Sequence, residues 1–121
     1  YALKFKLVFA AAELDEKNWV QDFGFLSKVK DEKGVTIKDW FKEIFDHTTI
    51  VSINDPYFME INKLHELGIV NLIAIDDVGC EKFAELVCRK LHKILSDMRV
   101  KVHSVECIEN EKNSAIYINE Q

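Results

Sequence analysis

The chain has 121 residues, of which 48% are hydrophobic and 31% are charged, with four glycines and one proline. This length and composition predict one globular domain over residues 1–121, and they exclude disordered, collagen-like and repeat proteins. The formal net charge of −5 argues against nucleic acid as the main partner, because phosphate binding requires a basic face.

The cysteines and the hydropathy pattern indicate the cellular compartment of the protein. Cys80, Cys88 and Cys107 form no C-x-x-C pair, and reduced thiols in a cytoplasmic protein are the simplest interpretation. No apolar run approaches the length of a membrane span, and no signal peptide is visible. We therefore expect a cytoplasmic protein without a membrane partner.

The first part of the chain predicts one strand and two helices. Residues 1–9 are hydrophobic at every second position, which predicts a half-buried strand of an antiparallel sheet. The carboxylate of Asp22 can cap a helix over FGFLSKVKDEK, residues 23–33. Thr36 can cap a second helix over IKDWFKEIF, residues 37–45, whose apolar residues follow helical spacing.

The middle of the chain predicts a loop, a short helix and a short strand. Residues 46–57, DHTTIVSINDPY, are expected to form the loop. Pro56 permits a helix over residues 58–67, which Gly68 can end. The apolar run VNLIAI, residues 70–75, predicts the strand.

The last part predicts a long helix and a pair of strands. Residues 81–95 place their apolar side chains on one stripe, which indicates an amphipathic helix. Strands are expected over residues 99–109 and 114–119, joined by a polar turn. Val102 and Val105 fall on opposite faces by strict alternation, which indicates a β-bulge between them.

The order of these elements predicts an α+β fold, with helices packed on one face of an antiparallel sheet. Because so few strands leave the sheet edges unpaired, we expect the chain to form an oligomeric barrel.

The histidines do not predict a structural metal site. His65 and His92 lie in helical stretches flanked by charge, so we expect both to be solvated. His103 lies in a strand beside the interior and is expected to be a hydrogen-bonded core histidine. The three have no ligand spacing between them.

Asp46, His47 and Glu106 are the candidates for chemistry. A carboxylate next to an imidazole suits a proton relay, although such pairs are also common where a helix ends in polar residues. Glu106 lies in an apolar strand, where an unpaired carboxylate costs free energy. Either it faces solvent, or it accepts hydrogen bonds from a ligand such as the N–H and NH2 edge of a guanine-like or pterin ring.

Four segments of the chain occur in an order that a known family shares. They are LDEKNWVQDFGFL, FDHTTI, VGCEKFA and VECIENEKNSAIY. They resemble L-D-x-x-G-x-V-x-D-F-x-x-L, L-D-H-x-x-L, P-T-x-E-x-x-A, and V-x-E-T followed by A-x-Y. These are motifs of the 6-pyruvoyl-tetrahydropterin synthase and 6-carboxytetrahydropterin synthase family, and the likeness extends from Tyr1 to Tyr117.

The resemblance implies a tunnelling fold in trimeric barrels that stack into hexamers. It also implies a zinc-dependent lyase that acts on 7,8-dihydroneopterin triphosphate. Asp46 and His47 match the family's proton-relay pair, and Glu106 matches the acid that anchors the pterin ring. Gly79 and Cys80 match a turn whose backbone also contacts the pterin. In that chemistry zinc would acidify carbinol positions of the substrate side chain while Asp46 and His47 move protons.

The chain departs from the family pattern at four positions, and the departures concern the substrate more than the fold. They are Asn18 for a glycine in the first motif, Val51 for an asparagine that often follows the second, Gly79 for the threonine of the third and Cys107 for the threonine of the fourth.

The zinc ligands that the resemblance implies lie outside this chain. FAAAEL, residues 9–14, is similar to the family's F-x-A-A-H-x-L zinc motif with Glu13 in place of the histidine. However, V-x-D-F follows only a few residues later, at Val20, whereas in the family the H-G-H segment and the second strand intervene. Aligned by V-x-D-F, FAAAEL ends the second strand, Glu13 is a solvated turn residue, and Tyr1 matches the tyrosine of H-G-H-x-Y. The resemblance therefore implies a first strand and zinc-binding histidines upstream of Tyr1.

The expected product is a 6-pyruvoyl- or a 6-carboxy-tetrahydropterin, the latter on the route to deazapurines such as queuosine. One alternative is a non-catalytic protein of the same fold that binds a pterin or purine through Glu106. Another is an oligomeric structural domain without a ligand.

Overall fold

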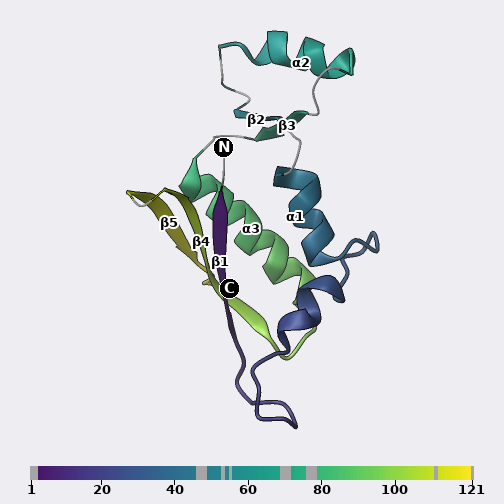
Figure 1. The fold of residues 1–121 in the computed structure, drawn as a ribbon, viewed down its shortest axis with the longest axis vertical. Coiled ribbons are helices and arrows are strands. Elements are labelled where there is room, and N and C mark those ends of the chain that lie inside the picture. The colour runs from purple at the N-terminus through teal and green to yellow at the C-terminus, as the bar shows by residue number, and fades with distance from the viewer. Residues whose placement is uncertain are drawn as a thin grey trace. The chain divides into compact units, whose positions relative to one another are not determined.

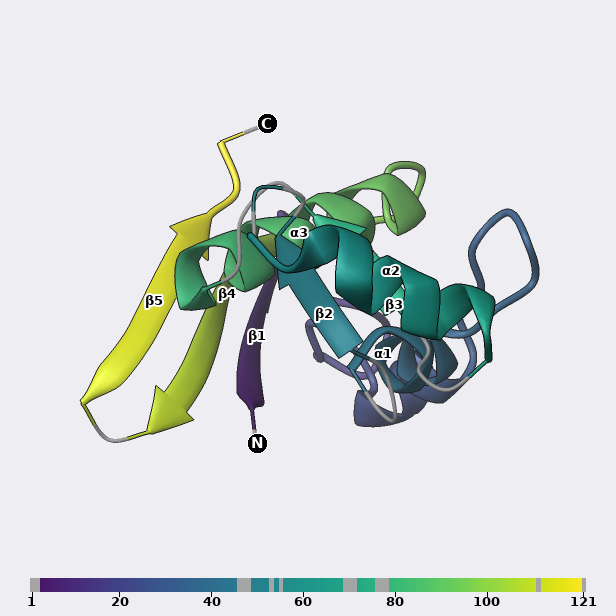
Figure 2. The same ribbon diagram turned by 90° about the horizontal axis from the view of Figure 1, so that it is seen from above.

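The computed structural model describes residues 3–45, 49–52, 54, 56–68, 72–75, 79–110 and 112–120. These residues form two compact units, each considered by itself below (Figures 1 and 2). The larger unit comprises residues 1–37 and 79–121, and the smaller unit comprises residues 38–78. No helix among the described residues is long and apolar enough to cross a membrane.

The larger unit is built on an antiparallel three-stranded sheet in the order β1-β4-β5. Its elements are β1 (Lys4–Ala10), the 3-10 helix η1 (Phe23–Ser27), α3 (Cys80–Ile94), β4 (Lys101–Asn110) and β5 (Asn113–Ile118). Helix α3 lies along one face of the sheet and contacts β4 and β5 (Figures 1 and 2). This arrangement confirms the predicted α+β class with a helix packed on one face of an antiparallel sheet.

The alternation predicted for the first strand is confirmed in β1. Phe5, Leu7 and Phe9 are partly buried, whereas the residues between them are exposed. Phe5 lies opposite Cys107 and Leu7 opposite Val105. The hydrophobic row of β1 therefore joins the buried row of β4, because directly opposed residues of antiparallel strands share a face.

A β-bulge lies where Val102 and Val105 predicted one. Val8 pairs with Ser104 while Phe9 pairs with Val102, so the register shifts by one residue. As a result, Val102 and Val105 are both buried, with 2% and 0% exposure. His103 lies between Val102 and Ser104 and has no opposing residue in the β1 register, and its side chain is exposed. Its predicted place in the core is wrong, because the bulge gives the buried side to the valines.

The amphipathic helix predicted over residues 81–95 is confirmed as α3, which begins one residue earlier. Phe83, Val87, Leu91 and Leu95 are at most 2% exposed and form the stripe that packs toward the sheet. Complete burial of such a side chain contributes roughly 1.5–3 kcal/mol, so this stripe contributes strongly to the stability of the larger unit.

The helix predicted over residues 23–33 is shorter than expected. Asp22 does cap it, since its Oδ1 accepts from the amide of Gly24 at 2.9 Å. The helix is η1, and it ends at Ser27. It cannot continue, because Asp31 organises a separate turn in which its Oδ1 accepts from the amides of Lys33 and Val35 at 2.9 and 3.0 Å. Side-chain acceptors of this kind compete with helical hydrogen bonds.

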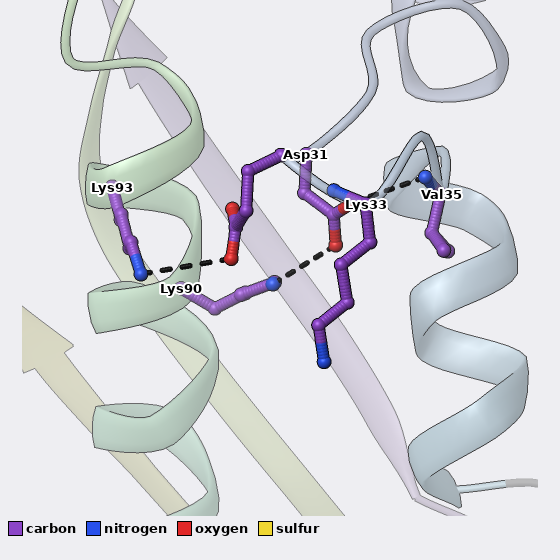
Figure 3. Close-up of polar contacts among 6 residues, drawn as sticks. Asp31, Lys33, Val35, Lys90 and Lys93 are labelled. Carbon is purple, nitrogen blue, oxygen red and sulfur yellow. Dashed lines mark hydrogen bonds and ion pairs between the residues drawn. The ribbon is translucent and has the colours of Figure 1, made fainter.

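Two ion pairs attach this turn to α3 (Figure 3). Lys90 Nζ lies 3.0 Å from Asp31 Oδ2, and Lys93 Nζ lies 3.7 Å from Glu32 Oε1. The hydrogen bond from Val35 and the ion pair with Lys90 lower the pKa of Asp31 below its ordinary value. The ionised form of Asp31 therefore stabilises the folded chain.

Replacement of Asp31 by asparagine should lower stability at neutral pH and change its acid dependence. Since the folded pKa is depressed, the contribution of Asp31 is present above its ordinary value of 3.8 and is lost as the pH falls through the folded pKa. Urea unfolding at a series of pH values from neutrality to below 3.8 would measure this. The wild type and the variant should converge at the acid end, whereas replacement of the exposed Asp97 should change little throughout. A constant difference at every pH would contradict the assignment.

The smaller unit contains α1 (Ile37–Phe45) except for its first residue, together with β2 (Thr49–Ser52), α2 (Phe58–Glu66) and β3 (Leu72–Ile75). Helix α1 has the predicted bounds, and its Trp40 ring packs edge-on against Phe41 and Phe45 at centroid distances of 5.3 and 6.4 Å. Helix α2 and strand β3 also lie where they were predicted. Gly68 follows α2 with φ +76°, the left-handed conformation that ends helices.

The loop predicted over residues 46–57 is wrong in part, because β2 lies within it. Strand β2 pairs in parallel with β3, with Thr49 opposite Leu72 and Ser52 opposite Ile75. In a strand of four residues, the alternation of apolar and polar side chains is too short to be recognised in the sequence. It forms here because a partner strand more than 20 residues away satisfies its backbone hydrogen bonds.

Candidate functional site

Three of the five predicted site residues lie in the described part of the larger unit. Gly79 directly precedes α3, Cys80 is the first residue of α3, and Glu106 lies in the middle of β4. Asp46 and His47 lie outside the described residues, so the proton-relay pair stays a prediction.

Gly79 forms the turn into α3 with an extended backbone, at φ 164°. This conformation is open to any residue, so it does not by itself require glycine. A Cβ at this position would lie 3.3 Å from Glu81 Oε2, the mobile end of a side chain. Without a side chain, Gly79 gives the first turn of α3 no capping hydrogen bond of its own. A threonine at the same position, as in the family motif, could accept from a free amide there.

Cys80 lies at the start of α3, which packs on β4, the strand that carries Cys107. Both residues are buried, with 8% and 0% exposure. Burial, followed by the contact with Cys80, raises the pKa of Cys107 to about 12, so its sulfur is a neutral thiol at physiological pH. The packing of α3 on β4 brings the VGCEKFA and VECIE segments together, which their separation in sequence could not show.

Glu106 projects from the opposite face of β4, away from the buried row of Val105 and Cys107. It lies between Lys6 on β1 and Ile116 on β5 in the strand register. Its side chain is half-buried, and within the described part of the chain its carboxylate makes no hydrogen bond or ion pair. A partly desolvated carboxylate without a protein partner is unusual, and it is available to accept donors from a ligand.

The surroundings of Glu106 on its sheet face are mixed: the exposed side chain of Lys6 lies opposite it on β1, and exposed apolar side chains lie beside it. Val8, Ile116 and Ile118 share its face of the sheet with exposures of 37%, 62% and 56%. Ser104 shares it as well and is 8% exposed. Sequence reasoning missed Ser104, although alternation from Glu106 could have placed the two on one face. The face therefore offers an acceptor beside apolar surface, a combination that suits a flat ring with N–H donors on one edge.

A cavity of about 480 Å³ lies elsewhere in the larger unit, between β1 and the segment that leads into η1. Phe5, Phe9, Val20 and Phe25 are among the residues that line it. The Phe9 and Phe25 rings meet there edge to face at a centroid distance of 5.0 Å. None of the predicted site residues lines this cavity, although Val8, which shares the sheet face of Glu106, does.

The histidines differ in their surroundings. His65 is exposed, as predicted. His92 is half-buried, and its Nδ1 forms a hydrogen bond with the side-chain nitrogen of Asn119 at 3.1 Å. That nitrogen also donates to the Val102 carbonyl at 3.0 Å. His92 is thus a structural partner of the segment after β5, and the prediction that it is simply solvated is incomplete.

The described residues do not fit a metal ion, since they contain no group of three or more histidine, cysteine, aspartate or glutamate side chains that could hold one. Glu13 is exposed in the turn after β1, which confirms its prediction as a solvated turn residue. Its backbone carbonyl accepts from Arg99, whose second terminal nitrogen donates to the carbonyl of Val20. Arg99 therefore holds both ends of this loop.

Comparisons with known proteins agree with this fold. The model of the 6-pyruvoyl tetrahydropterin synthase family matches residues 1–120. A solved structure of an uncharacterized protein from Wolinella succinogenes is similar, with a TM-score of 0.78 and 22% sequence identity over 98% of this chain and 77% of that chain. At this identity the likeness shows the fold alone. The search of curated proteins found no match. Because the family model covers nearly all of the sequence, the chain belongs to the 6-pyruvoyl tetrahydropterin synthase family.

Proposed function

We propose that this protein is a zinc-dependent pterin synthase. Its substrate would be 7,8-dihydroneopterin triphosphate, and its product a 6-pyruvoyl- or 6-carboxy-tetrahydropterin. Membership of the family supports a pterin-synthase-like function. The observation that carries the proposal is Glu106, a half-buried carboxylate for which the described residues provide no hydrogen bond or ion pair, on a sheet face that also carries exposed apolar side chains.

Glu106 would anchor the pterin ring. An ionised carboxylate has two oxygens and can accept one hydrogen bond from the ring N–H and one from the exocyclic NH2 group. Such charge-assisted hydrogen bonds are about twice as strong as neutral ones, and the parallel pair fixes the orientation of the ring. The apolar side chains of Val8 and Ile116 on the same face would contact the flat ring surface.

The turn at Gly79 and Cys80 would act through its backbone. Neither residue offers a charged group, and the thiol of Cys80 is buried. The free amides of the first turn of α3 are donors, and they suit acceptor atoms of a ligand. Because the pKa of Cys107 is raised to about 12, its thiol would take no part as a nucleophile.

The only support for zinc and for the proton relay in this proposal is the resemblance to the family. The ligands that it implies are histidines N-terminal to Tyr1, and the described residues contain no group that could replace them. Asp46 and His47 would move protons to and from the substrate side chain.

We include a homo-oligomer, a trimer or hexamer, in the same proposal. Strands β1 and β5 are the outer strands of the sheet among the described elements, and an outer strand presents unpaired backbone groups. Pairing between copies would satisfy them. Light scattering coupled to size-exclusion chromatography would measure the oligomer, and a monomer at micromolar concentration would contradict this part.

The proposed reaction is tested with the full-length protein. Metal content is measured on the purified protein, and turnover of 7,8-dihydroneopterin triphosphate is followed by chromatography and mass spectrometry, before and after chelation and zinc addition. We expect stoichiometric zinc and a tetrahydropterin product that is lost with the metal and restored with it. Tight pterin binding without turnover would favour the non-catalytic alternative. Absence of zinc from a protein with intact histidine ligands would overturn the synthase assignment.

A further inference from the structure

Two lysines place positive charge on the sheet face that carries Glu106, the face that α3 does not cover. Lys6 lies directly opposite Glu106 in the register of β1 and β4, and Lys4 lies opposite Ile108. Residues two apart on a strand share a face, so both lysines lie on the same side of the sheet as Glu106. Both are exposed, and within the described part of the chain neither ammonium group makes a hydrogen bond or an ion pair.

The charge of this part of the sheet differs from that of the whole chain. The chain has 16 lysine and arginine residues against 21 aspartate and glutamate residues, for a net charge of −5. From Lys4 to Val8 and across the partner strands, the open face instead carries Lys4 and Lys6 against the single carboxylate of Glu106. Its other residues are neutral: Val8, Ser104, Ile108, Ser114, Ile116 and Ile118. A local excess of positive charge in an acidic protein attracts anions.

We propose that Lys4 and Lys6 bind the phosphate groups of a ligand whose ring is held by Glu106. The two lysines would make the site specific for the phosphorylated form of the pterin. This inference rests on the proposed function, because the triphosphate belongs to the substrate proposed above. Lys4 and Lys6 are binding residues in this assignment, and they take no part in the breaking of bonds.

The spacing of the three residues suits a ligand with a flat ring at one end and an anionic tail at the other. Opposed residues of antiparallel strands have Cβ atoms about 5 Å apart, so the side chain of Lys6 begins beside that of Glu106. Lys4 lies about 7 Å farther along β1, so the two ammonium groups can contact different phosphates of one chain. Each ammonium group has three donors on a flexible stem, which suits phosphate oxygens.

The lysines also offset the charge of Glu106. A carboxylate repels an anionic tail, and this repulsion is stronger in a partly desolvated site than in bulk water. The ammonium group of Lys6, on the opposed residue, reduces that repulsion while the ring edge donates to the carboxylate. A pterin without phosphates needs no such compensation. Loss of the lysines should therefore weaken binding of the phosphorylated ligand and leave the unphosphorylated one unaffected.

Lysines on an outer strand also have a structural use, because they discourage pairing with other chains. Strand β1 is an outer strand of the sheet among the described elements. A purely structural role of Lys4 and Lys6 predicts aggregation of the variants without a change in ligand affinity. Measurement of both properties separates the two roles.

The test compares the full-length wild type with the double variant Lys4→Gln/Lys6→Gln. Calorimetry measures the affinity of each protein for neopterin triphosphate, for neopterin and for inorganic triphosphate; the oxidised pterins are chosen to separate binding from turnover. We expect the double variant to bind neopterin triphosphate and inorganic triphosphate about tenfold more weakly or worse, and neopterin within about twofold of the wild type. Added salt should weaken phosphate binding more in the wild type than in the variant, because salt screens charges.

Two further variants are the controls. Lys30 is exposed in the same unit, in the turn that its neighbour Asp31 attaches to α3, so Lys30→Gln should leave all three affinities within about twofold. Lys4→Arg/Lys6→Arg keeps both charges and should retain most of the affinity for the phosphorylated ligands. Circular dichroism and size-exclusion chromatography establish that the variants fold and do not aggregate.

Two results would overturn the inference. In one, the double variant binds neopterin triphosphate and inorganic triphosphate as tightly as the wild type, which leaves the lysines a structural role at the sheet edge. In the other, it loses affinity for neopterin by the same factor, which assigns the lysines to the ring or to the fold.

Failure of the proposed function has a different signature, since the wild type would then bind neither pterin. Inorganic triphosphate decides the role of the lysines in that case. Binding that is about tenfold weaker in the double variant supports an anion site at Lys4 and Lys6. Equal binding, or no binding by the wild type, overturns it.

Discussion

Replacement of Glu106 by glutamine should weaken pterin binding by about 100-fold or more while the fold stays intact. The amide keeps the size of the side chain but loses its charge and one of its two acceptor oxygens. Charge-assisted hydrogen bonds contribute about 1.5–3 kcal/mol each, and every 1.4 kcal/mol is about tenfold in affinity, so loss of the pair gives this magnitude. Titration of the full-length protein with a pterin, followed by calorimetry or fluorescence, would measure it.

Glu109 offers a matched control for that experiment. It lies on the same strand, is exposed, and carries the same charge, so Glu109→Gln should leave the affinity within about twofold of the wild type. Circular dichroism and size-exclusion chromatography of both variants would establish that fold and oligomer are unchanged. Equal affinity of Glu106→Gln and wild type would remove Glu106 from the binding site.

Truncation of Phe83 to alanine should be the most destabilising change in the larger unit, at about 3–5 kcal/mol. The ring is 2% exposed at the start of the buried stripe of α3, so its removal forfeits burial and leaves a cavity beside the sheet. Urea unfolding should show a lower midpoint with an unchanged slope.

Met59 on α2 is the contrasting position, because its side chain is 72% exposed. Met59→Ala should therefore change the free energy of unfolding by no more than about 0.5 kcal/mol. If Phe83→Ala were as mild as Met59→Ala, the packing of α3 on the sheet would not contribute to stability as proposed.

Features that depend on neighbouring residues could be predicted from the sequence. The alternation of residues 1–9 became the half-buried strand β1, and the apolar stripe of residues 81–95 became α3. Asp22 and Gly68 were recognised because capping and left-handed turns use only a few adjacent residues. Such patterns are local, and tertiary packing here agrees with them.

Strand β2 and the exposure of His103 could not be predicted, because both depend on partners distant in sequence. Strand β2 exists only through its parallel pairing with β3. His103 faces solvent because the bulge opposite Val8 and Phe9 assigns the buried side to other residues of β4. In each case a backbone hydrogen-bond pattern, rather than side-chain composition, determined the outcome.

The candidate site divides in the same way. Motifs in the sequence named Glu106, the turn at Gly79 and Cys80, and the pair Asp46 and His47 as site residues, and all five stay predictions. Only the tertiary structure packed the start of α3 and its turn on β4, and only the strand register put Glu106 on the face that α3 does not cover. The physical reason is that sequence spacing determines which residues a strand or helix presents together. Which of those faces is buried, and against what, depends on the packing of elements far apart in the chain.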